Sequence, residues 1–244
     1  MDWLFIHGAG SNADFWLGQQ PLLPAASYVN LPGHAPMRRT HGPAAPPAPP
    51  LPQISIAAYA AWVATYIAGL GVEDVVLVGH SMGGAVALEL ALGHPPWLRG
   101  LVLANTAARL PVAPALLSLL AHDYAAAVAW LMERYFAPGL SPYRAEGVRR
   151  QLLRLDPAVT AGDFHACAAF DVRARLAAAP LVVPTLILGG EAAQLTPPAA
   201  HTALAALLPA ATLTLLPGAG HMAPLEQPLA WNLEVGGWGA GVGA

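Results

Sequence analysis

The sequence contains no lysine and has few charged residues of any kind. All 11 basic residues are arginine, charged residues make up 10% of the 244 positions, and the formal net charge is -3. Proteins that bind nucleic acid or anionic lipid through electrostatics present a basic surface. The composition therefore argues against nucleic acid and membrane as partners and favours a small neutral molecule.

Cysteine and long apolar runs are also scarce. Cys167 is the only cysteine, which excludes an internal disulfide, and the N-terminus lacks a basic region followed by a cleavable apolar segment. Hydrophobic residues make up 56% of the chain, but Pro, Gly, His or Asp interrupts each apolar run before the roughly 18 residues that span a membrane. We therefore expect a cytoplasmic protein without a transmembrane helix.

Short apolar runs alternate along the chain with stretches of helical spacing. The strand-like runs cover residues 3–6, 27–31, 75–78, 101–103, 183–188 and 212–216, and the clearest helical stretches cover 56–70, 82–92 and 198–208. This alternation predicts a mainly parallel sheet of about six strands with helices on both faces. Between 107 and 179 only helical patterns remain, which predicts a helical cap inserted into a single domain of residues 1–244. The proline-rich segment 40–52 is expected to be an extended surface loop.

The most informative motif surrounds Ser81. The apolar run 75–78 leads into Gly79-His80-Ser81-Met82-Gly83 and then into a helical stretch. A G-x-S-x-G turn between a strand and a helix exposes a nucleophilic serine at the carboxyl edge of a sheet, and the tight turn requires the two glycines. Ser81 is the candidate nucleophile, and the Met82 amide at the start of the helix is a candidate oxyanion donor. The competing interpretation is an incidental glycine-rich turn.

Two other loops supply the remaining candidates. The run 3–6 ends in HGAG at 7–10, where the Ala9 amide is a candidate second oxyanion donor, although such a loop is often only a turn. His221 follows the last strand-like run, in the order serine, acid, histidine, and is the candidate general base. His7 and His80 are interpreted as residues that orient the backbone or line the pocket. The remaining histidines are dispersed, without the spacing of metal ligands, and no metal is predicted.

Together these motifs resemble the α/β-hydrolase superfamily, in particular its cofactor-free esterase, lactonase and C–C-bond hydrolase branches. The resemblance runs through HGAG at 7–10, LPGH at 31–34, GHSMGG at 79–84, LVLANTAAR at 101–109 and GAGHM at 218–222. It implies a three-layer α/β-hydrolase fold and a serine hydrolase that cleaves a small ester, lactone or related carbonyl compound through an acyl-enzyme, without a cofactor. Family members usually have two more strands before the HG strand, so segment 27–31 is expected to form an exposed edge.

The chain departs from the family at the catalytic acid. The family loop has the form G-x-x-D-x-x-x-P, but residues 190–197 place Ala193 at the aspartate position. Glu191 could supply the acid, or Asn105 could orient His221 without a charge. The alternative function is a catalytically weakened ligand-binding or sensor protein. Aromatic residues of the cap fit either substrate recognition or packing: Trp130, Tyr135, Phe136, Phe164 and Phe170.

Overall fold

A six-stranded, wholly parallel sheet forms the centre of the computed structural model, which describes residues 1–34 and 48–242. The strand order is β2-β1-β3-β4-β5-β6. The strands are β1 (Asp2–Ile6), β2 (Ser27–Val29), β3 (Val75–His80), β4 (Leu98–Ala104), β5 (Thr185–Gly190) and β6 (Ala211–Leu216). The number of strands and their parallel arrangement confirm the prediction. Most of the proline-rich segment 40–52 lies outside the described residues.

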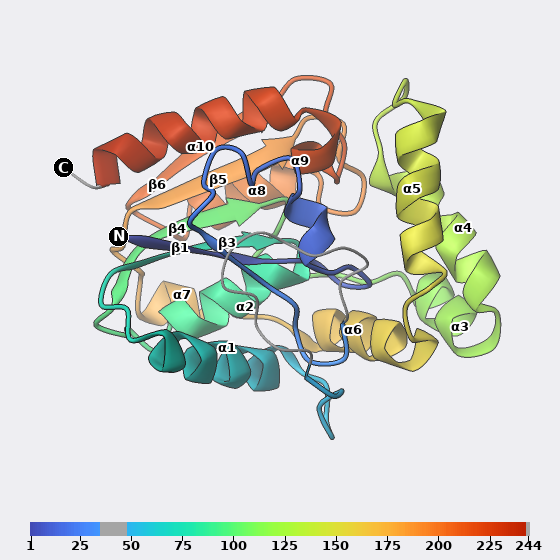
Figure 1. The fold of residues 1–244 in the computed structure, drawn as a ribbon, viewed down its shortest axis with the longest axis horizontal. Coiled ribbons are helices and arrows are strands. Elements are labelled where there is room, and N and C mark those ends of the chain that lie inside the picture. The colour runs from blue at the N-terminus through green and yellow to red at the C-terminus, as the bar shows by residue number, and fades with distance from the viewer. Residues whose placement is uncertain (35–47, 243–244) are drawn as a thin grey trace.

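Helices cover both faces of the sheet. They are η1 (Ala13–Trp16), α1 (Ile56–Leu70), α2 (Met82–Ala91), α3 (Pro114–His122), α4 (Tyr124–Tyr135), α5 (Pro142–Leu152), α6 (Pro157–Ala169), α7 (Arg173–Ala178), α8 (Pro198–Ala205), α9 (Ala223–Glu226) and α10 (Pro228–Val242). In Figure 1, α1, α2 and α7 lie on one side of the sheet and α10 lies on the other. The molecule thus has the predicted three layers.

The central strand β3 shows why its sequence is a continuous apolar run. Val75 and Leu77 pack into the core that includes α1 and α2, whereas Val76 and Val78 pack into the core that includes α10. Successive strand residues point to opposite faces, so a strand covered on both sides needs apolar side chains at every position. All six residues of β3 are buried.

The strand predicted at 27–31 is a covered edge rather than an exposed one. β2 lies at the end of the sheet beside β1, with Leu4 opposite Ser27. All three of its residues are buried. Part of the cover comes from η1, which precedes β2 in the chain and whose Ala13 amide donates to the side-chain oxygen of Asn30 at 2.9 Å. The expectation of an exposed edge was therefore wrong.

The helices α3 to α7 lie between β4 and β5 in the chain, within the segment predicted to form the cap. Figure 1 shows α3, α4 and α5 beyond the carboxyl ends of the strands, whereas α6 and α7 return to the side of the sheet that carries α1 and α2. We call α3 to α6 the cap helices. Of these, α3, α4 and α5 lie beyond the edge of the sheet at which β3 ends in the Ser81 turn.

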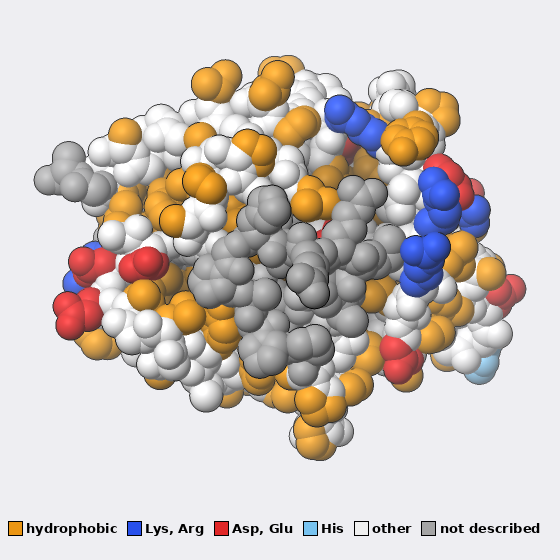
Figure 2. All heavy atoms as spheres, in the orientation of Figure 1, with side chains coloured by type: hydrophobic (Ala, Val, Ile, Leu, Met, Phe, Trp, Pro, Cys, Tyr) orange, Lys and Arg blue, Asp and Glu red, His pale blue; other side chains and the backbone are white. Residues whose placement is uncertain are grey.

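The surface carries few charges. Figure 2 shows blue side chains gathered near α5, which contains Arg144, Arg149 and Arg150, and mainly uncharged atoms elsewhere on this face. None of the helices within 1–34 and 48–242 has both the length and the apolar character needed to cross a membrane.

Candidate active site

Ser81 occupies a strained turn between β3 and α2. Its backbone has φ 52° and ψ -116°, a conformation that L-residues rarely adopt and that costs about 1–3 kcal/mol unless its surroundings hold it. A Cβ on Gly79 would overlap the backbone of Gly83, and a Cβ on Gly83 would overlap the carbonyl oxygen of Ile6 at the end of β1. Glycine at both positions is therefore required by the close approach of three backbone segments.

Two hydrogen bonds hold this turn in place. The Ser81 amide donates to the carbonyl oxygen of Ala104 at 2.9 Å, and the Thr106 hydroxyl donates to the Ser81 carbonyl oxygen at 2.8 Å. Both partners lie at or just after the end of β4, so the neighbouring strand fixes the conformation of Ser81.

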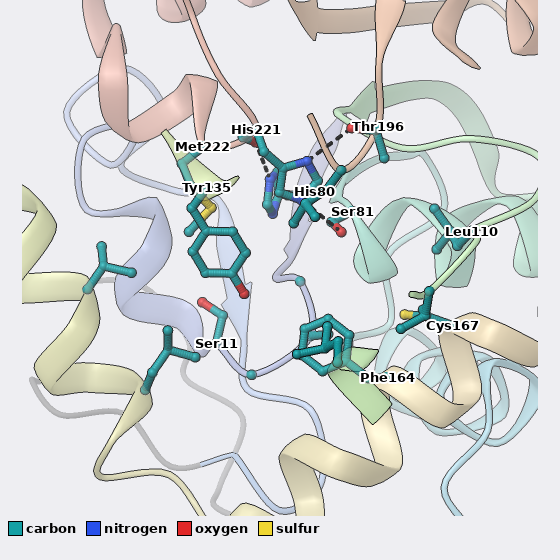
Figure 3. Close-up of a pocket in the computed structure, with 18 of the residues that line it drawn as sticks. Ser11, His80, Ser81, Leu110, Tyr135, Phe164, Cys167, Thr196, His221 and Met222 are labelled. Atoms are coloured by element: carbon teal, nitrogen blue, oxygen red, sulfur yellow. Dashed lines mark hydrogen bonds between the residues drawn. The ribbon is translucent and has the colours of Figure 1, made fainter. Parts of the chain in front are cut away.

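His221 lies next to Ser81 and is oriented by a hydroxyl group. Its Nε2 is 3.2 Å from Ser81 Oγ, and its Nδ1 is 3.0 Å from Thr196 Oγ1 (Figure 3). The Thr196 hydroxyl donates its proton to the main-chain carbonyl oxygen of Asn105 at 3.1 Å. Because that hydroxyl has only one proton, its oxygen must accept from Nδ1–H of His221. The Nε2 lone pair then faces Ser81, as a general base requires.

The geometry does not support either of the two groups suggested as the partner of His221. The Glu191 side chain is exposed, and no hydrogen bond joins it to His221 in the described part of the chain. The main-chain amide of Glu191 donates to the carbonyl oxygen of Leu216 at 3.1 Å, which fixes the backbone at this position. The Asn105 side chain donates to the carbonyl oxygen of Gly220 at 3.3 Å rather than to the ring.

Thr196 was missed by the sequence reasoning. It lies three residues after Ala193, which is buried and carries no polar group. The family pattern directs attention to a carboxylate, whereas the hydroxyl at the end of the same loop, directly before Pro197, meets the ring. A survey of every hydrogen-bonding residue in the loop would have included it.

Burial keeps the His221 ring neutral. Desolvation, followed by the neighbouring rings of His80 and His201, holds the pKa of His221 well below its usual value. His80 Nε2 donates to the main-chain carbonyl oxygen of His221 at 2.9 Å, and burial lowers the pKa of His80 to about 4. The neutral ring of His80 therefore holds the His221 backbone by a hydrogen bond, as expected of a residue that orients the backbone.

A half-buried carboxylate fixes the loop that carries His221. Glu226 of α9 accepts from the amides of Gly220 and Met222, each at 3.0 Å, and from the Ala137 amide at 2.9 Å. Burial raises the pKa of Glu226, against the opposing effect of these three donors. Glu226 thereby joins the backbone on both sides of His221 to the end of α4.

The HG loop passes close to Ser81. A Cβ on Gly8 would lie 3.3 Å from the Cβ of Ser81 and 2.9 Å from Nδ1 of His80, so only glycine allows this approach. The next amide is that of Ala9, and the Met82 amide begins α2 on the other side of Ser81. Within 1–34 and 48–242, neither amide donates to another group of the chain. Both are free to donate to a ligand.

A fully buried carboxylate connects the HG loop to the cap. Asp163 of α6 accepts from the Gly10 amide at 2.9 Å and from the Tyr59 hydroxyl at 2.7 Å, and it pairs with His34 Nε2 at 2.8 Å. Burial alone would lower the pKa of His34, but the charge and hydrogen bond of Asp163 raise it overall. Losing one member of such a buried pair typically costs about 3–5 kcal/mol, so this network firmly fixes the loop.

Ser81 opens into a small cavity of about 70 Å³ under the cap helices. Its walls are mostly apolar, and the described lining residues include no Asp, Glu, Lys or Arg. A larger cavity of about 560 Å³ adjoins it and shares four lining residues with it: Phe15, Val148, Gln151 and Leu225. Elsewhere within 1–34 and 48–242, no three His, Cys, Asp or Glu side chains are grouped as a metal site would require.

Comparison with known proteins identifies the family. A sequence model described as the alpha/beta hydrolase family matches residues 3–233. The chain belongs to the α/β hydrolase family. This membership confirms the resemblance drawn from the motifs, and the six-stranded sheet confirms the predicted fold.

Solved α/β hydrolase structures align over nearly the whole chain. A thermophilic esterase is 30% identical, with a TM-score of 0.83 over 99% of this chain and 90% of its own. Est816, described as an N-acyl homoserine lactone degrading enzyme, is 25% identical, with a TM-score of 0.79 over 97% of this chain and 92% of its own.

Several matches to curated relatives cover less than half of this chain. The putative carbamate hydrolase RutD of Azorhizobium caulinodans is 33% identical over 106 residues, which are 43% of this chain and 37% of that protein. The chain spans 23%, 37% and 59% of the lengths of the first three curated relatives, of which the first and third are described as dihydrolipoyllysine-residue acetyltransferase components of acetoin cleaving systems.

Proposed function

We propose that this α/β hydrolase family member is a serine hydrolase that cleaves a small ester or lactone through an acyl-enzyme. The observation that carries the proposal is the contact of 3.2 Å between Nε2 of His221 and Oγ of Ser81, in a turn strained at Ser81. A base within hydrogen-bond reach of an exposed hydroxyl is the arrangement that activates a serine.

The first half of the reaction forms the acyl-enzyme. His221 removes the Ser81 proton as Oγ attacks the substrate carbonyl carbon, and the carbonyl electrons move onto oxygen. The free amides of Ala9 and Met82 stabilise that oxyanion. His221 then returns the proton to the leaving alcohol oxygen as the ester bond breaks. Water attacks the acyl-enzyme by the same route, with His221 again acting as the base.

Thr196 has a positioning role in this proposal. Its oxygen holds the proton of His221 on Nδ1, which keeps the lone pair of Nε2 directed at Ser81. A neutral acceptor orients the ring but stabilises the imidazolium less than a carboxylate does. We therefore expect turnover below that of an otherwise equal site with a carboxylate.

The cavity and the structural neighbours indicate the type of substrate. A space of about 70 Å³ without charged walls suits a short, uncharged acyl group, and the adjoining cavity of about 560 Å³ has room for the leaving group. The names of the aligned structures include an esterase and a lactone-degrading enzyme. Short-chain esters and lactones are the substrates to test first.

An activated phosphonate tests the nucleophile directly. Incubation should add the phosphonyl group to Ser81, as located by mass spectrometry of peptides, and the Ser81→Ala variant should remain unlabelled. Labelling at another serine with Ser81 unmodified contradicts the assignment. A folded wild type that resists labelling and hydrolyses none of a panel of esters and lactones, yet binds one of them, would favour the ligand-binding alternative.

That alternative is not favoured by the comparisons or by the geometry. It rested on the missing carboxylate at Ala193, but Thr196 supplies His221 with a hydrogen-bond acceptor. The similar proteins include one named as a putative carbamate hydrolase, one as a methyl ester esterase and one as a thermophilic esterase.

A further inference from the structure

Two hydroxyl groups in the Ser81 cavity have no part in the proposed mechanism. Tyr135 is the last residue of α4, and Ser11 follows the HG loop. Figure 3 shows both hydroxyl groups pointing into the cavity from different parts of the chain. Tyr135 is 4% exposed and Ser11 is 8% exposed, so the cavity itself is the main surface available to both.

Neither hydroxyl is hydrogen bonded to another described residue, which sets Tyr135 apart from other buried tyrosines. The hydroxyl groups of Tyr28 and Tyr124 donate to main-chain carbonyl oxygens at 3.0 and 2.8 Å, and that of Tyr59 donates to a carboxylate. Neither oxygen is among the fully enclosed unpaired side-chain atoms, so both are open to the cavity. Two unpaired hydroxyls that face one cavity can therefore hydrogen-bond a polar group on the ligand.

The Tyr135 ring is held in position before any ligand binds. Its carbonyl oxygen accepts from the Met222 amide at 3.1 Å. Its ring stacks near that of His221, with 6.0 Å between centroids and 21° between planes. Burial raises the pKa of Tyr135, so its hydroxyl remains a donor through the neutral pH range. A donor fixed in this way loses little conformational entropy on binding.

The described lining residues include no charged side chain, which indicates that the ligand group bound by the two hydroxyls is uncharged. A carboxylate or ammonium group would lose its hydration here without gaining an opposite charge. A neutral oxygen, such as an ether, ketone or hydroxyl oxygen, needs only the hydrogen bonds that the two hydroxyl groups can provide. The small volume of about 70 Å³ requires this oxygen to lie within a few bonds of the carbonyl carbon.

We propose that the hydroxyl groups of Tyr135 and Ser11 form a subsite for a neutral oxygen atom in the acyl part of the substrate. The preferred substrates are then short oxygen-bearing esters rather than simple alkanoate esters. This proposal rests on the proposed serine hydrolase activity. A site built to hydrogen-bond an oxygen discriminates against the analogue in which a methylene replaces it, because its polar groups are then left unpaired.

Matched ester pairs test the subsite. The probes are para-nitrophenyl methoxyacetate against butyrate, and para-nitrophenyl methoxypropionate against pentanoate, in which an oxygen replaces one methylene. For each pair, kcat/KM of the oxygen ester is divided by that of the alkanoate ester. Comparing this ratio between variants cancels the intrinsic reactivity of the esters and the fraction of active enzyme.

The expected result is a lower kcat/KM ratio in the two cavity variants and an unchanged ratio in the control. Tyr135→Phe and Ser11→Ala should each lower the ratio about fivefold for at least one pair, as expected for the loss of one hydrogen bond. Tyr143→Phe, which removes the hydroxyl of an exposed tyrosine on α5, should leave both ratios unchanged.

Unchanged ratios in both cavity variants, with hydrolysis retained, would overturn the subsite and leave the serine hydrolase proposal intact. Failure of the wild type to hydrolyse any of the four esters would count against both proposals, and phosphonate labelling of Ser81 would then show whether the nucleophile assignment also fails.

Discussion

Replacing Thr196 by valine should impair catalysis by removing one hydroxyl group while preserving the shape of the side chain. The hydroxyl accepts from Nδ1 of His221 at 3.0 Å and donates to the carbonyl oxygen of Asn105 at 3.1 Å. In Thr196→Val the Nδ1–H donor is left buried without its partner, and the ring is no longer restricted to the tautomer that activates Ser81. Stranding one buried donor costs about 1–3 kcal/mol.

If that cost falls on the transition state, kcat should decrease by about 5- to 150-fold, since each 1.36 kcal/mol corresponds to a factor of ten. The effect should appear mainly in kcat, because Thr196 acts through His221. Thr196→Ser, which keeps the hydroxyl, should retain a rate within about threefold of the wild type. Glu191→Gln should also retain its rate, because the Glu191 side chain is exposed and makes no hydrogen bond to the ring in the described structure.

The assay is steady-state hydrolysis of a short para-nitrophenyl ester, with a thermal melt of each variant to check that it is folded. A folded Thr196→Val enzyme with kcat within twofold of the wild type would refute the role given to the hydroxyl. A large loss of kcat in Glu191→Gln would support Glu191 as the catalytic acid, as the sequence first suggested.

Three further predictions concern charge. Ala193→Asp should increase kcat for an activated ester and raise the pKa of His221, provided that the new carboxylate reaches Nδ1; an unchanged rate and pH profile would show that it does not. In the wild type, kcat/KM should stay level as the pH falls below 6.5, because the lowered pKa of His221 keeps the base neutral, and a pH–rate profile with its acid limb above 6.5 would contradict this. Stability should fall between pH 6.5 and 4, because His80 and His201 have pKa values of about 4 when folded and about 6.5 when unfolded, so the unfolded chain binds more protons there. Each contributes a loss of about 2 kcal/mol at pH 5. The lowered pKa values of His7 and His221 add to the loss, and the raised pKa values of His34 and Glu226 partly offset it. Urea unfolding at pH 7.5 and 5 measures the sum.

The parts of the site that the sequence predicted are those set by local chain geometry. Ser81 could be identified because its turn needs glycine at fixed positions between a strand and a helix, and each of these features is contiguous in the sequence. His221 was found because the order of the elements places the loop after the last strand beside that turn. The structure brings these two residues into contact, whereas their catalytic roles stay predictions.

The supporting contacts could not be predicted in the same way, because they join distant parts of the chain. Asp163 holds Gly10 from a helix that is 153 positions away in the sequence, and Glu226 bonds the Ala137 amide 89 positions away. A carboxylate in a helical pattern looks like a solvated charge when only its neighbours in sequence are considered. Its burial depends on how the cap helices pack, which periodicity alone does not specify.

The same limit explains why the sequence did not suggest Thr196 as the group that orients His221. The family spacing predicts a carboxylate at Ala193, and its absence suggested a weakened site. In the folded loop, however, the hydroxyl of Thr196 bridges His221 and the main chain after β4. The groups found beside the ring are neutral: the hydroxyls of Ser81 and Thr196, the imidazole of His80 and the phenol of Tyr135.

In the proposed mechanism, such a site would stabilise the imidazolium of the transition state less than a carboxylate would, so the rate would depend more on the oxyanion donors and on exact placement of Ser81. The firm attachment of the two loops on either side of Ser81 fits that requirement. Asp163 fixes the loop that offers the Ala9 amide, and Glu226 fixes the loop that offers His221. Both carboxylates act through the backbone and lie outside the cavity lining. The chain therefore uses one buried and one half-buried carboxylate to hold its loops, while the described lining of the cavity carries no charged side chain.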